Sequence, residues 1–406
     1  MAHLHEKIHI QRIRQFIDRL SRDIVREQIP FEAEFAWSRE PVPFEKLQSL
    51  EFRSVDEGAV WGETWESAWF HLRGRVPEQW RGGRVVARID LGGETLVCDA
   101  SGSPLCGLTS GSVFDANYSK DVAHLIEECR GGEDVELWAE SAANGLFGVQ
   151  RNDPETLEDP GRLHGYYEGR VKALRLCLFD HDRWQLWLDF VVLFDLMKSL
   201  PDNTARRWAL LHELSAGVDA FEREGPTASR EHLAALLAVP SDPATVDVTA
   251  VGHAHLDTGW MWPVRESIRK VGRTFASQLA LIDRYPDYVF GASQPALYQM
   301  AKDHYPSLYR RVKEAVAAGR WECQGGMWVE ADCNVTGGES LVRQLVHGIH
   351  FYLDEFGVRV RNLWLPDVFG YSANLPQILH RAGVDYFLTQ KMSWSRYNTF
   401  PHNTFV

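Results

Sequence analysis

The strongest constraint on the fold is a regular alternation of short apolar runs and longer stretches of helical spacing after residue 245. The apolar runs lie at 246–251, 288–292, 321–324, 360–365 and 384–388. The stretches of helical spacing lie at 264–284, 296–318, 339–356 and 374–382. Strict alternation of strands and helices requires a parallel sheet with right-handed crossovers. Such a sheet is either an open doubly wound sheet or a barrel. A closed eight-stranded barrel takes about 250 residues, more than residues 246–406 provide, so a barrel here would be an incomplete (β/α) barrel-like domain.

The segment before residue 245 is organised differently. An apolar stripe at spacings of three and four predicts a packed helix over 10–24. Short alternating runs between glycine-rich turns predict a β-sandwich over 61–178. Longer periodic runs predict helices over 184–200 and 204–237, and the proline-containing segment 239–243 ends them. The fold class is therefore α+β followed by α/β. The predicted domains are an accessory region, 1–245, and the barrel-like domain, 246–406.

Composition narrows the class of ligand. Of the 406 residues, 45% are hydrophobic and 24% are charged, which is typical of a globular protein. The formal net charge of -13 disfavours nucleic acid and anionic membranes as partners, so a neutral ligand fits better. The six cysteines show no CxxC pair, and the N-terminus has no apolar leader segment. We therefore expect reduced thiols and a cytoplasmic protein.

Polar side chains gather where the predicted strands end. His253, His255 and Asp257 follow the first strand, and Ser293 and Gln294 follow the second. Glu330 follows the third strand, Asp367 the fourth and Lys391 the fifth. The carboxyl ends of parallel strands meet at one edge of a sheet, where α/β enzymes carry their sites. The distribution therefore favours an enzyme.

The segment Gly252 to Asp257 predicts a metal site. In an extended backbone, residues two apart project to the same face, so His255 and Asp257 can converge on one cation while Leu256 packs behind them. An imidazole and a carboxylate are ordinary ligands for zinc. A pair of capping polar residues at a strand end is the alternative interpretation. His253 is either a third ligand or an outer partner that orients the others, and we favour the second role.

Asp367 lies between an apolar strand and a glycine-containing turn. It could complete the metal shell or attack a substrate. It could also cap the following helix, but Ser372 and Asn374 are nearer to the predicted start of that helix. We therefore expect a functional carboxylate.

Several motifs in fixed order match a known family. They are HAHLDTGW with MWP at 253–263, GGMWVE at 325–330, WLPDVFGYS at 364–372, LTQKMSW at 388–394 and FPH at 400–402. The chain resembles the α-mannosidases of glycoside hydrolase family 38, in particular the branch of cytosolic and vacuolar eukaryotic enzymes and their bacterial relatives. The sandwich-like first half resembles the accessory region of that branch.

The resemblance implies roles for individual residues. His255 and Asp257 would bind Zn²⁺, with Co²⁺ as the alternative metal, and Asp367 would be both a metal ligand and the nucleophile of a retaining reaction. Trp260 and Phe369 would pack against mannose, and Lys391 would contact the sugar. The implied substrate is a mannose-containing oligosaccharide, and association into homo-oligomers is left open. We expect Trp262 and Trp328 to be core residues.

The resemblance also implies that part of the catalytic machinery lies downstream of Val406. In the family, the remaining zinc-binding histidine and the acid/base aspartate follow the FPH segment. Glu330 and Asp332 are the carboxylates here that could substitute as the acid, and we do not expect them to. The chain is thus expected to be the N-terminal part of an α-mannosidase.

Two other functions are compatible with the sequence. A metal-dependent amidohydrolase or TatD-like nuclease would use the HxH pair, but it needs further histidines at later strand ends. The remaining candidates fall in predicted helices: His304, His347, His350 and His380. A catalytically inactive carbohydrate-binding remnant is the other alternative.

Overall fold

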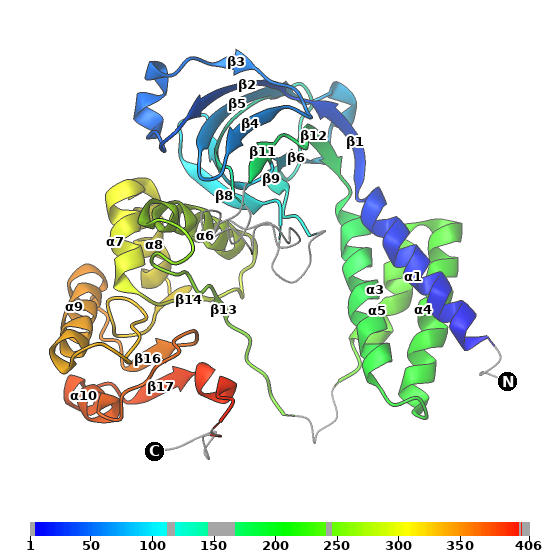
Figure 1. Ribbon diagram of the computed structural model, residues 1–406. Helices are drawn as coiled ribbons and strands as arrows, with labels where there is room; N and C mark the ends of the chain where they lie inside the picture. Colours follow the sequence, from blue (N-terminus) through cyan, green and yellow to red (C-terminus); the bar gives the residue numbers. More distant parts are fainter. Residues whose placement is uncertain (1–4, 112–117, 145–166, 241–245, 398, 400–406) are drawn as a thin grey trace.

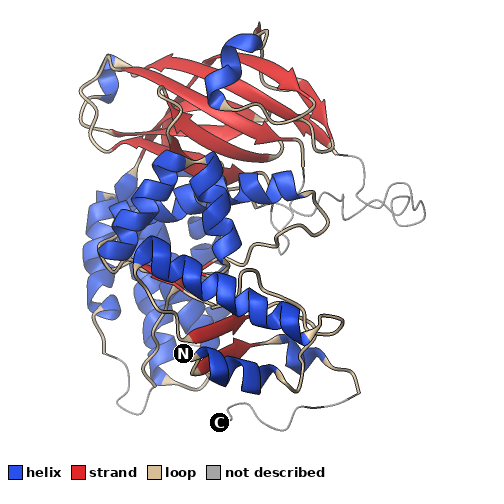
Figure 2. Cartoon of the chain, turned by 90° about the vertical axis from the view of Figure 1, so that its left-hand side faces the viewer, coloured by secondary structure: helices blue, strands red, loops and turns tan. Residues whose placement is uncertain are grey.

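A computed structural model describes residues 5–111, 118–144, 167–240, 246–397 and 399. The described chain forms a β-sandwich, a helical bundle beside it, and an α/β part that begins after residue 245 (Figure 1). Figure 2 shows the sandwich lying across one end of the helices of the α/β part. Residues 241–243 of the predicted domain boundary, and the FPH segment at 400–402, lie outside the described residues.

Two antiparallel sheets form the sandwich. The first has the strand order β1 (Val25–Pro30), β12 (Ala173–Phe179), β6 (Arg84–Asp90) and β9 (Val122–Ile126). The second has the order β3 (Arg53–Ser54), β2 (Glu32–Ser38), β5 (Ser67–Arg75), β10 (Asp134–Ala142), β7 (Glu94–Asp99) and β8 (Pro104–Thr109). β4 (Val60–Glu63) pairs with β11 (Glu168–Arg170), and two 3₁₀ turns, η2 (Phe44–Ser49) and η3 (Glu78–Trp80), join strands.

The predicted sandwich is confirmed, but it begins earlier than residue 61. Strands β1 and β2 also belong to it, and β1 is an edge strand that pairs with β12 alone. Most side chains of β1 are exposed, so its sequence lacks the apolar alternation that identifies a half-buried strand. Phe35 of β2 and Phe70 of β5 are paired neighbours in the second sheet, and their buried rings lie 5.6 Å apart in the core of the sandwich. Burial of each such ring stabilises the fold by about 1.5–3 kcal/mol.

The helical bundle contains the N-terminal helix and the three helices after β12. They are α1 (Glu6–Asp23), α3 (His181–Ser199), α4 (Ala205–Glu224) and α5 (Pro226–Leu237). The apolar stripe of α1 is buried as predicted, and Phe16 contacts the rings of Phe190 and Phe221 at 4.8 and 5.0 Å. The predicted helix over 204–237 is two helices. Gly225 has a φ of +90°, and Pro226 starts the next helix.

The α/β part carries parallel strands in chain order. β13 (Gly252–His253), β14 (Phe290–Ala292) and β15 (Trp321–Cys323) form one parallel sheet, and β16 (Asn362–Leu365) pairs in parallel with β17 (Tyr386–Thr389). The backbone N–H of Gly326 donates to the carbonyl of Asn362, at 3.0 Å, so β16 continues the sequence of strands. The helices are α6 (Val264–Arg284), α7 (Pro295–His304), α8 (Pro306–Ala317), α9 (Gly338–Phe356) and α10 (Leu375–Ala382).

The predicted barrel-like alternation is confirmed, with two corrections. The first predicted strand, 246–251, is irregular, and the strand consists of Gly252 and His253 alone. Val246 and Val248 are 79% and 84% exposed, so this apolar run gains no burial from a neighbouring strand among the described residues. The predicted helix over 296–318 breaks at Pro306, because proline has no N–H and disfavours helical geometry in the residue before it.

The sandwich docks on α6 through buried charges. Nζ of Lys270 lies 2.5 Å from Oε2 of Glu94, and Arg269 pairs with both Glu140 of the sandwich and Glu266 of its own helix. All five of these side chains are buried. The two parts therefore share one charged interface.

Close approach of the two backbones requires a glycine at this interface. A Cβ on Gly107 of β8 would stand 2.6 Å from the Cβ of Arg273 on α6. The N–H of Gly107 donates to Oγ of Ser277, at 2.9 Å.

In the part of the chain that the structure describes, no helix has the length and apolar character needed to cross a bilayer.

Candidate metal centre

His255 and Asp257 lie in the irregular segment that follows β13. Oδ1 of Asp257 is 3.3 Å from Nε2 of His255, so the two side chains face each other as the HxD spacing predicts. Leu256, between them, packs against the core of the α/β part. The alternation of the extended backbone thus sends one apolar side chain inward and two polar side chains to the same side.

The Asp257 loop is fastened to the first turns of α6. The buried Oγ of Ser267 donates to the carbonyl of Asp257, at 2.8 Å, and accepts from the N–H of Gly259, at 2.8 Å. Nε1 of Trp262 donates to the same oxygen, at 3.1 Å. Gly259 has a φ of +77°, which other residues rarely adopt. One hydroxyl therefore fixes the turn that presents Asp257.

Asp367 joins this pair from the end of β16. Its Oδ2 lies 3.5 Å from Nε2 of His255, although the two residues are 112 positions apart in the sequence. One donor atom from each of His255, Asp257 and Asp367 lies within 4.8 Å of the others. Among the described residues, no other set of three His, Cys, Asp or Glu side chains comes together in this way.

The spacing of the three donors suits a metal ion. Two donors bound tetrahedrally to zinc at roughly 2.0–2.1 Å stand about 3.3–3.4 Å apart. The separations from Nε2 of His255 to Asp257 and Asp367 are 3.3 and 3.5 Å. One nitrogen and two carboxylate oxygens also form an ordinary donor set for zinc or cobalt. The residues present therefore fit a divalent cation.

The electrostatics of the cluster favour positive charge beside His255. Burial lowers the pKa of this imidazole, but hydrogen bonding and charge from Asp257 and Glu330 outweigh burial and raise the pKa to about 10. The cause is that anionic side chains flank both ring nitrogens. A cation among these carboxylates would receive the same stabilisation.

Glu330 contacts the far side of the His255 ring. Its Oε2 lies 2.7 Å from Nδ1, and its side chain is only 4% exposed. The sequence placed Glu330 at the end of the third predicted strand and named it as a substitute acid that we did not expect to act, but it gave Glu330 no role beside His255. Asp332, the other such candidate, is exposed and accepts the N–H of Asn334, at 2.7 Å.

His253 has both ring nitrogens engaged away from the cluster. Nδ1 lies 2.8 Å from the carbonyl of Gly291, and Nε2 accepts the indole N–H of Trp364, at 3.0 Å. These partners assign the proton to Nδ1. His253 therefore has no nitrogen directed at His255, and its two hydrogen bonds do not involve any of the three donors.

Lys391 contacts the remaining oxygen of Asp367. Its Nζ lies 2.5 Å from Oδ1, and its side chain is 12% exposed. It belongs to a 3₁₀ turn, η5 (Lys391–Trp394), that follows β17. The ammonium also lies 4.0 Å from the ring centre of Trp394 and 5.5 Å from that of Phe369. The sequence did not single out Trp394, although the LTQKMSW motif contains it.

The rings of Phe369 and Trp394 lie beside the ammonium that contacts Asp367, whereas Trp260 follows Asp257 by three positions and packs against Trp262. Trp260, Phe369 and Trp394 are 51%, 64% and 61% exposed. The rings of Phe369 and Trp394 meet edge to face at 6.0 Å. Exposed rings around a polar cluster offer the flat apolar faces on which a sugar can stack.

Two family models match this chain. The alpha-mannosidase jelly roll domain matches residues 29–169, and the N-terminal domain of glycosyl hydrolases family 38 matches residues 245–406. The second match contains every member of the cluster. Residues 245–406 belong to glycosyl hydrolase family 38. The resemblance found in the sequence motifs is therefore confirmed.

Matches to curated relatives also cover the N-terminal part of this chain. Human alpha-mannosidase 2C1 is 32% identical over 90% of this chain, and a Saccharomyces cerevisiae alpha-mannosidase is 28% identical over 89%. The pig epididymis-specific alpha-mannosidase is 29% identical but matches only 39% of this chain. The chain spans about a third of the curated relatives, 34% of both the human and the yeast protein.

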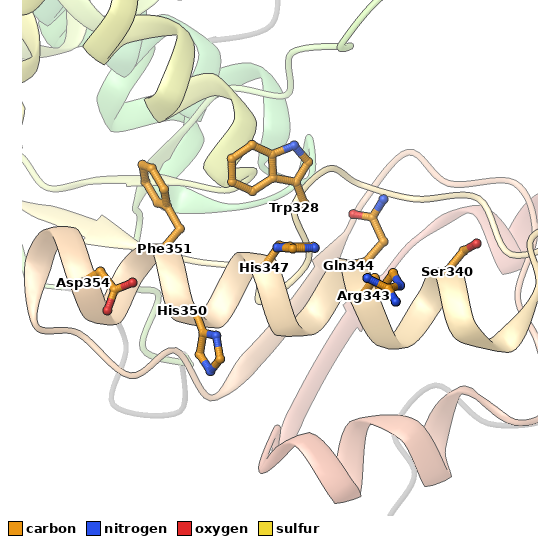
Figure 3. A pocket seen from close by; sticks show the side chains of 8 residues that line it. All are labelled: Trp328, Ser340, Arg343, Gln344, His347, His350, Phe351 and Asp354. Atoms are coloured by element: carbon orange, nitrogen blue, oxygen red, sulfur yellow. The ribbon is translucent and has the colours of Figure 1, made fainter.

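A separate cavity of about 660 Å³ lies on the outer face of α9 in the family 38 domain. Figure 3 shows Trp328 above His347 and Gln344 at its rim. His255, Asp257 and Asp367 do not line it. Trp328 is therefore only partly buried, not the core residue that we expected, and Trp262 is likewise partly buried, with Nζ of Lys270 4.3 Å from its ring.

The remaining histidines of the family 38 domain lie on helices, as the sequence predicted. His347 and His350 belong to α9, and His380 belongs to α10. His304 is the last residue of α7. None of them takes part in the cluster of three donors, so these residues do not supply the additional ligands that the amidohydrolase interpretation requires.

Proposed function

We propose that this chain carries the metal-binding part of an α-mannosidase active site that cleaves terminal α-mannosides with retention of configuration. The observation that carries the proposal is the convergence of His255, Asp257 and Asp367 within the family 38 domain. The printed names of the relatives, all alpha-mannosidases, support the substrate class.

The proposed metal is Zn²⁺, with Co²⁺ as the alternative. His255, Asp257 and Asp367 would hold it, through Nε2 and one oxygen of each carboxylate. When bound, the ion would polarise and hold sugar hydroxyls as a Lewis acid. A further ligand would come from the longer protein, as the family resemblance implies.

Asp367 is the proposed nucleophile, and its two oxygens have different neighbours. Oδ2 faces His255, and Oδ1 faces the ammonium of Lys391. Once Lys391 has released it, Oδ1 would attack the anomeric carbon as the bond from that carbon to the leaving oxygen breaks. The leaving oxygen takes a proton from a carboxylic acid, and water then releases the sugar from the ester.

Lys391 would change partner during this reaction. Its ammonium contacts Oδ1 of Asp367, the oxygen that must reach the anomeric carbon. We propose that substrate binding transfers this ammonium to a sugar hydroxyl, which frees Oδ1. Trp260 and Phe369 would hold the faces of the mannose ring, and their exposure supports this role.

The proton donor is proposed to lie outside residues 1–406. Glu330 is buried against His255, and Asp332 caps its own exposed turn. We therefore expect little turnover by this chain alone, because general acid catalysis supplies roughly 10²–10⁴-fold.

The cellular setting is also a proposal. All six cysteines are free thiols, and burial raises the pKa of Cys177 to about 11 and of Cys323 to about 12. Free buried thiols and a net charge of -13 suit a cytoplasmic protein whose partner is a neutral glycan rather than nucleic acid or a membrane.

Metal-dependent binding of a mannose mimic tests the proposal. Deoxymannojirimycin would be titrated into the chain, and tryptophan fluorescence would be followed with and without Zn²⁺. We expect binding that requires the metal, exceeds binding of deoxynojirimycin, and disappears in Asp257→Ala but not in Asp332→Ala. Equal binding of both sugar mimics, or binding that ignores the metal, would contradict the proposal.

Hydrolysis of an aryl α-mannoside separates the catalytic proposal from the carbohydrate-binding alternative. The full reading frame that contains residues 1–406 should hydrolyse it with retention, and a fluorinated mannosyl reagent should label Asp367. Sugar binding without turnover in that full-length protein would instead favour a carbohydrate-binding remnant.

A further inference from the structure

We propose that Glu330 is a positioning residue for the metal centre, which holds the His255 ring so that Nε2 is presented to the cation. This inference rests on the proposed metal-binding role of His255. It concerns a carboxylate that is not one of the three donors.

The two nitrogens of His255 face different groups. Nδ1 lies 2.7 Å from Oε2 of Glu330, whereas Nε2 faces Asp257 and Asp367 at 3.3 and 3.5 Å. A neutral imidazole carries one proton, so a carboxylate at Nδ1 retains the proton there and leaves the Nε2 lone pair for the metal. The ring orientation and its tautomer thus depend on Glu330.

Burial makes this contact the main interaction of both atoms. Oε2 of Glu330 and Nδ1 of His255 are fully covered, and neither makes a hydrogen bond of regular geometry with a described residue, so their 2.7 Å ion-pair contact is the polar interaction left to both atoms. A buried carboxylate oxygen without a partner is strongly destabilising. The imidazole N–H is the group placed to compensate it.

Ser293 and Gln294, at the end of β14, fix Glu330 from the other side. Oγ of Ser293 donates to Oε1 of Glu330, at 2.6 Å, and the N–H of Glu330 donates to Oε1 of Gln294, at 3.2 Å. Nε2 of Gln294 donates in turn to the carbonyl of Leu256, at 2.8 Å. The loops that carry His255 and Glu330 are therefore joined through one amide.

Gln294 adopts a strained conformation to make these bonds. Its φ is +66°, in the left-handed region, and its side chain is buried. A residue other than glycine persists in this region when its surroundings over-determine it, and such residues cluster at functional sites. The strain supports a specific function for the Ser293, Gln294 and Glu330 assembly.

Cobalt affinity tests the role of Glu330 without reliance on turnover. Co²⁺ would be titrated into the metal-free chain, and its visible absorption would report the affinity and the ligand field. Loss of an outer partner of a metal-binding histidine typically weakens binding roughly 10–100-fold. We expect Glu330→Gln to show this loss at an unchanged stoichiometry, and Glu322→Gln, on the exposed side of β15, to bind as the wild type does.

The outcomes distinguish the two proposals. If wild type binds Co²⁺ and Asp257→Ala does not, but Glu330→Gln binds within twofold of wild type, the positioning role is wrong and the metal centre stands. If wild type binds no Co²⁺, the metal centre itself is contradicted.

A measurement on the wild-type chain covers the case in which Glu330→Gln does not fold. Nitrogen chemical shifts of the Zn²⁺-loaded chain, labelled with ¹⁵N at histidine, identify which ring atom binds the metal. We expect a protonated Nδ1 and a metal-bound Nε2 for His255. A metal-bound Nδ1 would overturn the inference.

Discussion

Nζ of Lys270 lies 2.5 Å from Oε2 of Glu94, and this ion pair joins the sandwich to the helix that supports the metal-binding loop. The same ammonium lies 4.3 Å from the ring of Trp262, whose N–H donates to Ser267. Ser267 in turn donates to the carbonyl of Asp257. The accessory sandwich is thereby connected to a proposed metal ligand through four successive contacts.

Removal of the charge of Glu94 should destabilise the chain. Glu94 is buried and also contacts Asn144 and Arg273. Glu94→Gln therefore leaves the buried Lys270 without its counter-ion, whereas Arg273 keeps Glu140 and Glu266. Loss of one partner of a buried pair costs about 3–5 kcal/mol. Urea unfolding measures the change. Arg343→Gln breaks an exposed pair with Glu339 and should change stability by less than about 1 kcal/mol.

The same interface should weaken in acid. Burial raises the pKa of Glu94, but Lys270 and Arg273 lower it further, so the folded value lies below the ordinary 4.5. The stability contributed by this depressed carboxylate is complete above the unfolded value and is lost as the pH falls through the folded one. Unfolding curves from pH 6 to pH 3 should therefore converge for wild type and Glu94→Gln. Parallel curves would refute this assignment.

Substitution of Lys391 should separate metal binding from sugar binding. Its ammonium neutralises one oxygen of Asp367, so Lys391→Met should strengthen Co²⁺ binding, by at least about threefold, because a nearby like charge opposes the cation. Binding of deoxymannojirimycin should weaken in the same variant. Calorimetry measures both, and a parallel loss of the two affinities would show that Lys391 is only structural.

Trp394 should contribute to sugar binding. Its exposed ring lies beside Phe369 and under Lys391, at the border of the donor cluster. Trp394→Ala should weaken binding of the mannose mimic and leave Co²⁺ affinity unchanged. Tyr397, which is 94% exposed, provides the control, and Tyr397→Ala should bind the mimic normally. Equal effects of the two substitutions would exclude a specific role.

His253 should prove dispensable as a ligand. Because Gly291 and Trp364 occupy its nitrogens, His253→Asn should retain one metal ion per chain and lose thermal stability. Elemental analysis and thermal unfolding provide the two values. A variant that folds but contains no metal would make His253 a ligand.

The sequence predicted the donor cluster because its chemistry is local or follows from sheet topology. The HxD spacing places His255 and Asp257 on one face, and the parallel order of strands brings Asp367 to the same edge. The contact between Glu330 and His255 was not predicted, because it joins two loops. The approach of these loops depends on the packing around Gln294.

The differences between the predicted and the observed secondary structure also have specific causes. Val246 to Val251 has the composition of a buried strand, but composition does not reveal whether a neighbouring strand covers the run. The break at Pro306 was visible in the sequence, whereas the edge strand β1 lacks the alternation by which strands are recognised.

X-ray absorption at the zinc edge tests the central claim, that His255, Asp257 and Asp367 bind one cation. The Zn²⁺-loaded chain should show only nitrogen and oxygen donors at roughly 2.0–2.2 Å, with the outer-shell signature of a single imidazole. His255→Ala should remove that signature, and Asp367→Asn should alter the first shell. Sulfur at about 2.3 Å, two imidazoles, or a spectrum that neither substitution changes would contradict the account.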